Sequence, residues 1–506
     1  MRFTSALATM SAPHPNDMTR LSERLQDSQF SQLGDAFFTR LKATPLAQPY
    51  YIAHSSKLAQ ELGIAEQLLR DEDSLSLLSG NQTPAQAQPL AAVYSGHQFG
   101  VWAGQLGDGR AILLGALRDN AGQETEIQLK GAGLTPYSRS GDGRAVLRSS
   151  IREFLCSEAM AALGIPTSRA LCLTGSPQRV YRETPETSAV VTRTASSFIR
   201  FGSFEHFYYQ RRFDELRQLA DFVIQNYFPA CLQAENPYQA LLIQVCERTA
   251  EMIAHWQAVG FMHGVMNTDN MSILGLTLDY GPFGFMEAFD ESHICNHTDQ
   301  QGRYSYRNQP SIGNWNVYAL GQALLPLIGS VEQTEQALSS YRSSFEQHWI
   351  KLSSAKFGLA SNQPEDKVLM DDFFQLLQAN HADMTNSFRA LSHLNLQTSE
   401  ADHPLSDLFI DRNGLAQWLL RYRHRLAAET RSETARKAAM RATNPKYVLR
   451  NYLAQQAIEQ AQQGDFSEIQ HLLHVLQTPF EEQPEFEHYA ALPPDWAADL
   501  EVSCSS

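Results

Sequence analysis

In the first half of the chain, apolar and polar residues alternate with the two-residue period of β-strands. Glu124–Lys130 (ETEIQLK) places Gln128 and Lys130 on its polar face, opposite two apolar residues. Arg110–Leu117 (RAILLGAL) is a short apolar run that precedes it across a turn. Together the two segments predict an antiparallel hairpin. Further strands are predicted at residues 169–175 and 189–195.

Helical spacing of apolar residues appears next. It runs from about Ala145 to Leu163, where Gly164 and Pro166 then supply a stop. Residues 30–90 have the patterns of helices and loops. After about residue 205 the pattern becomes helical, with amphipathic segments at residues 214–228 and 241–261 and a mostly helical C-terminal third.

Strand patterns therefore precede helical patterns, an order typical of an α+β protein. A length of 506 residues predicts two to four structural units, or one enlarged domain with extensions. We expect a flexible start at residues 1–30, a strand-rich N-terminal lobe with glycine-rich loops at 31–205, a helical lobe at 206–330, and a helical extension with a flexible, cysteine-containing tail at 331–506.

Composition narrows the possible functions. Forty Lys and Arg against 55 Asp and Glu give a net charge of −15, which argues against nucleic-acid binding and against binding to an anionic membrane. An acidic protein can still bind a polyphosphate if its few cations converge on one pocket. The six cysteines contain no C-x-x-C pair, so neither a disulfide framework nor a zinc site is predicted. No run of about 18 apolar residues occurs, and the N-terminal segment lacks a hydrophobic h-region, so we expect neither a membrane span nor secretion. The sequence thus predicts a cytoplasmic protein, with a monomer as the default.

The most informative stretch is His263–Gly281 (HGVMNTDNMSILGLTLDYG), which follows a long amphipathic helix. Asp269, Asn270 and Asp279 in this stretch carry side-chain oxygens, and two of these separated by a short strand-turn-strand can bind one Mg²⁺. "DN" and "DYG" are also common turn sequences. Because both occur after such a helix, we favour the metal site.

The same stretch can be compared with the protein-kinase signature H-R-D-x-x-x-x-N followed by D-F-G. His263 and Asn270 have the spacing of its His and Asn, and Asp279 begins the D-F-G equivalent. The catalytic Asp of kinases is replaced by Val265, which cannot accept a proton. Asp269 is the carboxylate that remains beside the metal-binding Asn.

Kinases also pair a strand Lys with a Glu on the next helix. Lys130 ends a predicted strand, and Glu153 lies within a predicted helix. Alone, each residue would be interpreted as a solvated surface charge. Together with the downstream motif, they predict an ion pair that holds the ammonium near a phosphate.

Glycine-rich segments and two arginines complete the candidate set. LGDGRA contains Gly107, Gly109 and Arg110, and SGDGRA contains Asp142 and Gly143. Neither is a P-loop, and Asp-Gly is also a frequent hairpin turn, but glycines allow the backbone to approach phosphate oxygens closely. Two arginines lie in apolar surroundings, where their guanidinium groups need either a carboxylate or a phosphate partner: Arg193 and Arg200.

Several long strings closely resemble the selenoprotein O (SelO, or YdiU) family. They are YSGHQFGVWAGQLGDGRA, ETEIQLKGAGLTPYSRSGDGRAVLRSSIREFL, VVTRTASSFIRFGSFEHF, HGVMNTDNMSILGLTLDYGPFGFME and NPKYVLRNY. The resemblance runs from about residue 30 to the C-terminus. It implies a protein-kinase-like fold without the usual catalytic Asp, in which ATP lies reversed and its α-phosphate faces the incoming hydroxyl.

The activity implied by the resemblance is transfer of AMP from ATP to Ser, Thr or Tyr hydroxyls of proteins, including the enzyme itself. Some members are similar but transfer UMP from UTP with Mn²⁺, so Mg²⁺ and Mn²⁺ are both expected metals. The resemblance also implies roles for single residues. Lys130, Arg193 and Arg200 would grip the phosphates; Gly107, Gly109, Arg110, Asp142 and Gly143 would contact the nucleotide; Glu153 would hold Lys130; Asn270 and Asp279 would bind the metal; and Asp269 would be the proton acceptor.

The family often carries a redox-active Sec or Cys near its C-terminus, and Cys504 has that placement here. We hypothesise a regulatory disulfide between Cys504 and Cys295, with an exposed free thiol as the alternative. Two other functions remain open at this point. Val265 suggests a non-catalytic pseudokinase that binds nucleotide as a scaffold, whereas Asp269 would allow a kinase-type phosphotransferase.

Overall fold

A computed structural model describes residues 20–118, 122–397 and 403–502. Within these residues, an antiparallel sheet of eight strands has the order β1-β3-β6-β7-β10-β9-β2, and β8 pairs with β10. The strands are β1 (Phe38–Arg40), β2 (Tyr50–His54), β3 (Leu90–Ala92), β6 (Ala111–Arg118), β7 (Glu124–Lys130), β8 (Ala145–Val146), β9 (Arg169–Tyr181) and β10 (Pro185–Ala195).

The predicted hairpin is confirmed, because β6 and β7 pair antiparallel with Ile112 opposite Leu129. The prediction of helices and loops alone over residues 30–90 was wrong, since β1 and β2 also lie there, whereas β3 begins only at Leu90. These strands have three to five residues, too few for a clear alternation, and their sheet partners determine their conformation. Along the chain, α1 (Leu21–Arg24) precedes these strands, and α2 (Ser56–Glu61) and α3 (Glu72–Leu78) lie between β2 and β3.

The two strands predicted from residue 169 onward are confirmed but are longer than expected. β9 continues through Pro177, where a central strand would normally stop. The register explains this: Ser176 pairs with Ser188 and Arg179 pairs with Thr187, so Pro177 lies in a β-bulge. Proline therefore needs no ladder hydrogen bond at this position.

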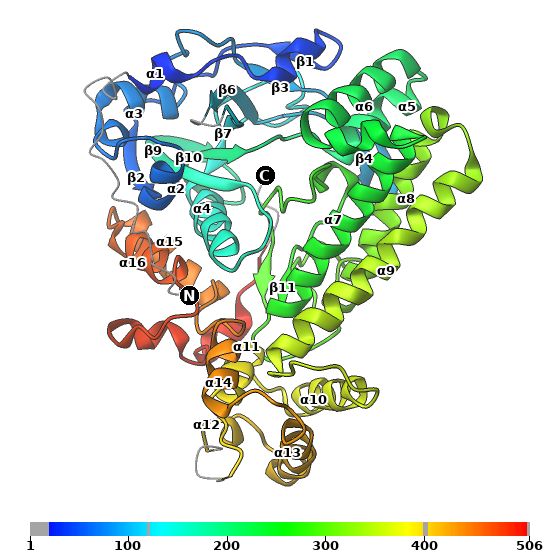
Figure 1. Cartoon of the computed structure of the whole chain (residues 1–506). Coiled ribbons are helices and arrows are strands. Elements are labelled where there is room, and N and C mark those ends of the chain that lie inside the picture. Colours follow the sequence, from blue (N-terminus) through cyan, green and yellow to red (C-terminus); the bar gives the residue numbers. More distant parts are fainter. Residues whose placement is uncertain (1–19, 119–121, 398–402, 503–506) are drawn as a thin grey trace, which may run out of the picture.

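Helix α4 (Leu147–Ala162) packs against β9 and β10 below the sheet (Figure 1). It starts two residues later than the sequence predicted, because Ala145 and Val146 join the sheet as β8. Most of α4 is buried, including the carboxylate of Glu153. The helix therefore carries a charged group into the interior, where it needs a cationic partner.

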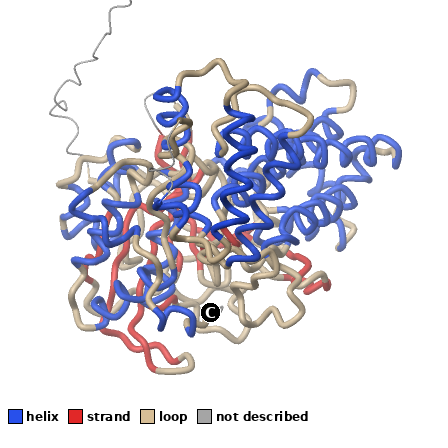
Figure 2. Tube along the Cα trace, turned by 90° about the horizontal axis from the view of Figure 1, so that it is seen from below, coloured by secondary structure: helices blue, strands red, loops and turns tan. Residues whose placement is uncertain are grey.

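The second half of the chain is mainly helical, and Figure 2 shows most of the strands gathered on one side of the molecule beside the helices. Helices α7 and α9 pack along each other, and α8 packs against both. Short strands β11 (Phe261–Met262) and β12 (Gly284–Phe285) follow α7 and flank His263–Gly281, the candidate catalytic loop. The helices of this half are α5 (Phe201–Tyr209), α6 (Phe213–Tyr227), α7 (Pro237–Val259), α8 (Gln309–Ile328), α9 (Val331–Lys356), α10 (Asp366–Asn380), α11 (Met384–Leu391), α12 (His403–Ser406), α13 (Arg412–Leu426) and α14 (Glu433–Arg441).

Two last helices, α15 (Asn451–Gln462) and α16 (Ser467–Leu476), return to the sheet and pack against α4. The largest hydrophobic core accordingly joins residues of the sheet, α4, α7, α8 and these two helices. The α+β class and the kinase-like arrangement of a sheet-bearing lobe and a helical lobe are confirmed. The domain boundaries remain predictions. Among the described helices, none has the length and apolar character needed to cross a bilayer.

Candidate active site

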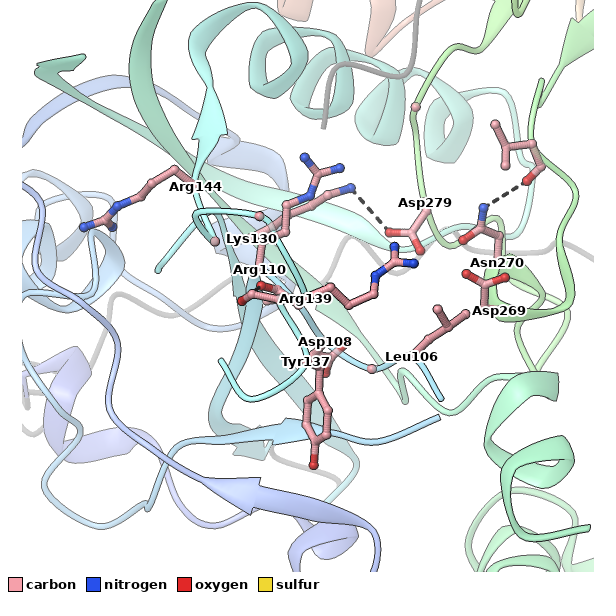
Figure 3. A pocket seen from close by; sticks show the side chains of 18 of the residues that line it. Leu106, Asp108, Arg110, Lys130, Tyr137, Arg139, Arg144, Asp269, Asn270 and Asp279 are labelled. Atoms are coloured by element: carbon pink, nitrogen blue, oxygen red, sulfur yellow. Dashed lines mark hydrogen bonds and ion pairs between the residues drawn. The ribbon is translucent and has the colours of Figure 1, made fainter. Parts of the chain in front are cut away.

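A cavity of about 920 Å³ is lined by residues of both lobes. On the sheet side it is bordered by Lys130 and the glycine-rich segments, and on the helical side by Asp269, Asn270 and Asp279 (Figure 3). All twelve site residues predicted from the sequence occur in or beside this cavity; Glu153, which contacts Lys130 from behind, lines a smaller adjoining one. Such a volume accommodates a nucleoside triphosphate.

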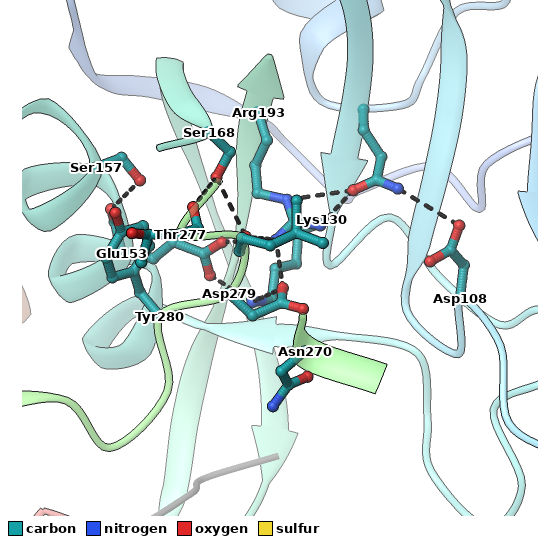
Figure 4. Close-up of polar contacts among 12 residues, drawn as sticks. Asp108, Lys130, Glu153, Ser157, Ser168, Arg193, Asn270, Thr277, Asp279 and Tyr280 are labelled. Carbon is teal, nitrogen blue, oxygen red and sulfur yellow. Dashed lines mark hydrogen bonds and ion pairs between the residues drawn. The ribbon is translucent and has the colours of Figure 1, made fainter. Parts of the chain in front are cut away.

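The predicted ion pair between strand and helix is present. Lys130 Nζ, at the end of β7, lies 2.6 Å from Glu153 Oε2 of α4 and 3.4 Å from Asp279 Oδ1. Arg193 Nη1 of β10 lies 3.1 Å from Glu153 Oε1 and 2.5 Å from Asp279 Oδ1 (Figure 4). Arg200 contacts the other oxygen of Asp279. Three cations thus gather around one carboxylate.

This arrangement fixes the charge of Asp279. Burial alone would raise its pKa, but Arg200, Arg193 and Lys130 outweigh burial and hold the pKa well below the usual range. The two arginines are 1% and 3% exposed, so their charges interact with little screening by solvent. In this cluster three cationic side chains contact two carboxylates, those of Glu153 and Asp279.

Asp269 lies in a different environment, on the short 3₁₀ turn η5 (Thr268–Asn270). Its Oδ2 accepts a hydrogen bond of 3.1 Å from Gln98, and its Oδ1 is buried with no hydrogen-bond partner among the described residues. Burial raises its pKa to about 6, although the Gln98 hydrogen bond and Arg200 act in the opposite direction. A carboxylate with a free oxygen and a pKa near neutrality suits a proton acceptor.

Asn270 has the orientation expected of a metal ligand. Its side-chain nitrogen donates to the carbonyl of Val265 at 3.0 Å, and its oxygen faces Asp279 (Figure 3). No group of three or more His, Cys, Asp or Glu side chains positioned for a metal occurs in the described parts of the chain. One carboxylate and one amide oxygen fit Mg²⁺ or Mn²⁺ if nucleotide phosphates supply further ligands.

The glycine-rich segments pack tightly at the cavity rim. A Cβ on Gly107 would lie 2.4 Å from the Tyr137 ring, and one on Gly143 would lie 2.2 Å from the backbone of Gly133. Asp142 forms an ion pair with Arg182 at 2.8 Å. Gly109 and Arg110 line the cavity as well, and Arg110 makes no ion pair with any described residue. The glycines therefore allow close packing of the backbone at the rim, and Arg110 adds a cationic side chain to the cavity.

Two functional candidates were not predicted from the sequence. Gln128 accepts a hydrogen bond from Arg193 Nε at 3.2 Å and donates to Asp108, which is buried and has a raised pKa because of that burial. Gln98 holds Asp269, as described above. The alternation of β7 could have identified Gln128, since it shares the polar face with Lys130. No signal pointed to Gln98, because its contact spans 171 residues.

The disulfide hypothesis cannot be followed to its second partner, since Cys504 lies outside the described residues. Cys295 is buried, and burial raises the pKa of its thiol to about 12. Its Sγ lies 3.0 Å from the carbonyl oxygen of Pro282, to which it donates. The hypothesis remains a prediction.

Comparisons with known proteins agree with the geometry. The family model described as "Protein adenylyltransferase SelO" matches residues 21–477. A "Protein nucleotidyltransferase YdiU" from Herminiimonas arsenicoxydans is 60% identical over 500 residues, covering 98% of this chain and 100% of that protein. A protein of the same name from Burkholderia mallei (strain ATCC 23344) is 54% identical, covering 100% of this chain and 100% of that protein. Another from Dechloromonas aromatica (strain RCB) is 56% identical, covering 95% of this chain and 97% of that protein. The chain, with its cationic cavity and its kinase-like lobes, belongs to the SelO family of protein adenylyltransferases.

Proposed function

We propose that this protein transfers AMP from ATP to Ser, Thr or Tyr hydroxyls of proteins, itself included, and releases pyrophosphate. UTP would serve as an alternative donor of UMP. The observation that carries the proposal is the convergence of Lys130, Arg193 and Arg200 on Asp279 inside a cavity of an otherwise acidic protein. Three fixed cations at one place are suited to a triphosphate.

The cations explain why the leaving group would be pyrophosphate. Attack at the α-phosphorus breaks its bond to the bridging oxygen and transfers negative charge to the β- and γ-phosphates. Fixed cations stabilise that charge because they need not reorganise during the reaction. In this proposal Lys130, Arg193 and Arg200 hold the phosphates, Glu153 orients Lys130, and the nucleotide contacts come from Gly107, Gly109, Arg110, Asp142 and Gly143.

Asp269 would take the proton of the attacking hydroxyl. Its buried, unpartnered Oδ1 is the atom available to accept it, and the pKa of about 6 leaves the group mostly ionised at pH 7. General-base catalysis of this kind contributes typically about 10²–10⁴-fold. Val265 lines the same cavity but offers no side-chain acceptor.

Asn270 and Asp279 would hold the divalent metal, Mg²⁺ or Mn²⁺, together with phosphate oxygens. When bound, the metal would neutralise part of the phosphate charge. Asp279 would then exchange some of its contacts with Arg193, Arg200 and Lys130 for the metal, which would free those cations for the phosphates.

Labelled ATP tests the proposal. Purified protein, metal and an acceptor protein are incubated with ATP labelled at the α- or the γ-phosphate. Retention of the α-label alone supports nucleotidyl transfer, retention of the γ-label alone would support a kinase-type phosphotransferase, and retention of neither would support a pseudokinase scaffold.

The Asp279→Ala variant tests the site assignment. It should lose transfer of the α-label, because a metal ligand is removed and three cations lose their shared partner. Asp371→Ala, which removes an exposed partner of Lys367, is the control and should keep full activity. Persistent transfer by the Asp279 variant would contradict the assignment.

A further inference from the structure

A small hairpin extends from the sheet-bearing lobe over the candidate catalytic loop. It consists of β4 (Ser95–Gln98) and β5 (Val101–Gln105), joined by Phe99 and Gly100. Both turn residues have positive φ, 50° and 80°, as in a type I′ hairpin turn. Phenylalanine adopts such a φ only at a cost, which indicates that the hairpin's conformation is imposed by its surroundings.

Those surroundings are the loop that carries Asp269. The backbone N–H of Phe99 donates to Asn267 at 3.0 Å, the backbone N–H of His97 donates to Thr268 at 2.7 Å, and Gln98 donates to Asp269 at 3.1 Å. Strand β4 also packs against α5. The outer edge of β4 is therefore covered, and the hairpin has a fixed position relative to the proton acceptor.

In the described parts of the chain, strand β5 has no such cover. Its only strand partner among the described residues is β4. Val101 is 70% exposed, and Ala103 and Gln105 are also exposed. The sequence VWAGQ contains no charge and no proline, the features by which proteins usually protect an open edge.

The orientation of the backbone at this edge follows from the pairing. His97 lies opposite Trp102, and the N–H of His97 points away from β5 toward Thr268. In an antiparallel pair of this kind both residues turn their backbone groups outward. Trp102 therefore presents its N–H and C=O at the open edge.

We infer that β5 binds the acceptor protein, which adds to this edge as an extended, hydroxyl-bearing segment. The inference rests on the proposed function, since it concerns the second substrate of the same site. The position supports this occupant: β5 begins beside Gln98, the hydrogen-bond partner of Asp269, and is followed directly by Leu106 and Gly107, which line the nucleotide cavity. A segment on β5 thus passes from the proton acceptor to the nucleotide.

Apolar groups beside the strand add contact area for such a segment. The Trp102 ring lies 4.0 Å from the Tyr209 ring, centroid to centroid, and Phe99 and Tyr209 are 41% and 39% exposed. Pairing through the backbone would tolerate varied sequences. The acceptor class is therefore an extended or locally unfolded segment with an apolar side chain near the hydroxyl.

A matched pair of variants tests this inference. Trp102→Ala and Trp102→Pro both lose the ring, but only the proline loses the outward N–H, which an edge strand tolerates structurally. The probe is dephosphorylated β-casein, an unfolded acceptor rich in hydroxyls, with α-labelled ATP. We expect kcat/KM for casein to be at least about tenfold lower in Trp102→Pro than in Trp102→Ala. The proline removes one hydrogen bond between β5 and the acceptor segment and weakens the adjacent ones. Equal values in the two variants would overturn the inference.

A second measurement uses the unaltered enzyme and so does not depend on how the variants fold. A peptide around the casein hydroxyl that is labelled is N-methylated at one backbone amide at a time. Strand pairing predicts that labelling is lost at every second position, because alternate amides face β5. If N-methylation is tolerated equally at every position, the inference is overturned. It is also overturned if the enzyme labels itself but not casein, or if the chain forms a dimer that Trp102→Pro dissociates. If the unaltered enzyme transfers no α-label to any protein, the proposed function itself fails.

Discussion

At the scale of single residues, the two carboxylates of the cavity are set apart by their partners. Asp279 is surrounded by cations and stays ionised, whereas Asp269 accepts a hydrogen bond from Gln98 and has a pKa that burial raises to about 6. Environments that separate two pKa values in this way divide the roles of the two groups. The sequence identified both residues, but it could not indicate which carboxylate would be surrounded by cations, because Arg193 and Arg200 lie 79 or more residues away in sequence.

The pKa of Asp269 predicts a pH dependence of transfer. A proton acceptor must be ionised, so kcat/KM should be constant above about pH 7 and should fall as the pH drops through 6. At pH 5 the rate should be about tenfold lower than the plateau, because about one tenth of the carboxylate is then ionised. Initial rates with α-labelled ATP measure this. In Asp269→Asn the residual rate should lose this slope, and an unchanged slope would assign the titration to another group.

At the scale of elements, the sequence predicted the strands and helices that have a regular hydrophobic period. It missed the elements whose conformation depends on residues far away in the sequence. The hairpin β6–β7 and helix α4 follow their hydrophobic periods closely. β9 was predicted too short because Pro177 falls in a bulge whose existence depends on the register with β10. The hairpin β4–β5 has no hydrophobic alternation that would predict its strands, and hydrogen bonds to residues 267 and 268 hold it in place. Its position was therefore outside the reach of local sequence reasoning.

The glycine-rich loops give a prediction at the same scale. Gly143 has a φ of +71°, and an added Cβ would lie 2.2 Å from the Gly133 carbonyl group, so Gly143→Ala must separate two loops at the cavity rim. Gly164→Ala is the matched control, with a φ of +76° and nothing within 4 Å of the added carbon. Both variants incur strain from the positive φ, roughly 1–2 kcal/mol. Only Gly143→Ala should in addition weaken ATP binding, by about tenfold or more, in equilibrium dialysis; equal ATP affinities would show that the loops are not part of the nucleotide site.

At the scale of the whole molecule, the C-terminal helices act as a support for the helix that carries Glu153. Arg152 of α4 donates to Asn451 of α15 at 3.1 Å and, at 2.6 Å, to the carbonyl of Phe283 in the loop after Asp279. Gln477 donates to Ser55 at 3.1 Å, near the sheet edge. The last part of the chain therefore contacts both the sheet edge and Arg152, the α4 residue that also holds the loop after Asp279.

This connection predicts the effect of truncation. A chain that ends after residue 442 lacks α15 and α16, so it exposes the buried residues of α4 and leaves Arg152 without Asn451. These helices belong to the largest core, so their loss removes a large part of its apolar contacts. A typical domain is stable by only roughly 5–15 kcal/mol, and we expect the loss of these contacts to exceed that margin. We expect this chain to show no cooperative thermal transition and no ATP binding.

A chain that ends after residue 500, which loses the contact between Val502 and His297 but keeps both helices, should melt within a few degrees of the full protein. Calorimetry of the two chains measures the difference, and a cooperative transition at the normal temperature in the shorter one would mean that α4 is held in place by the sheet alone.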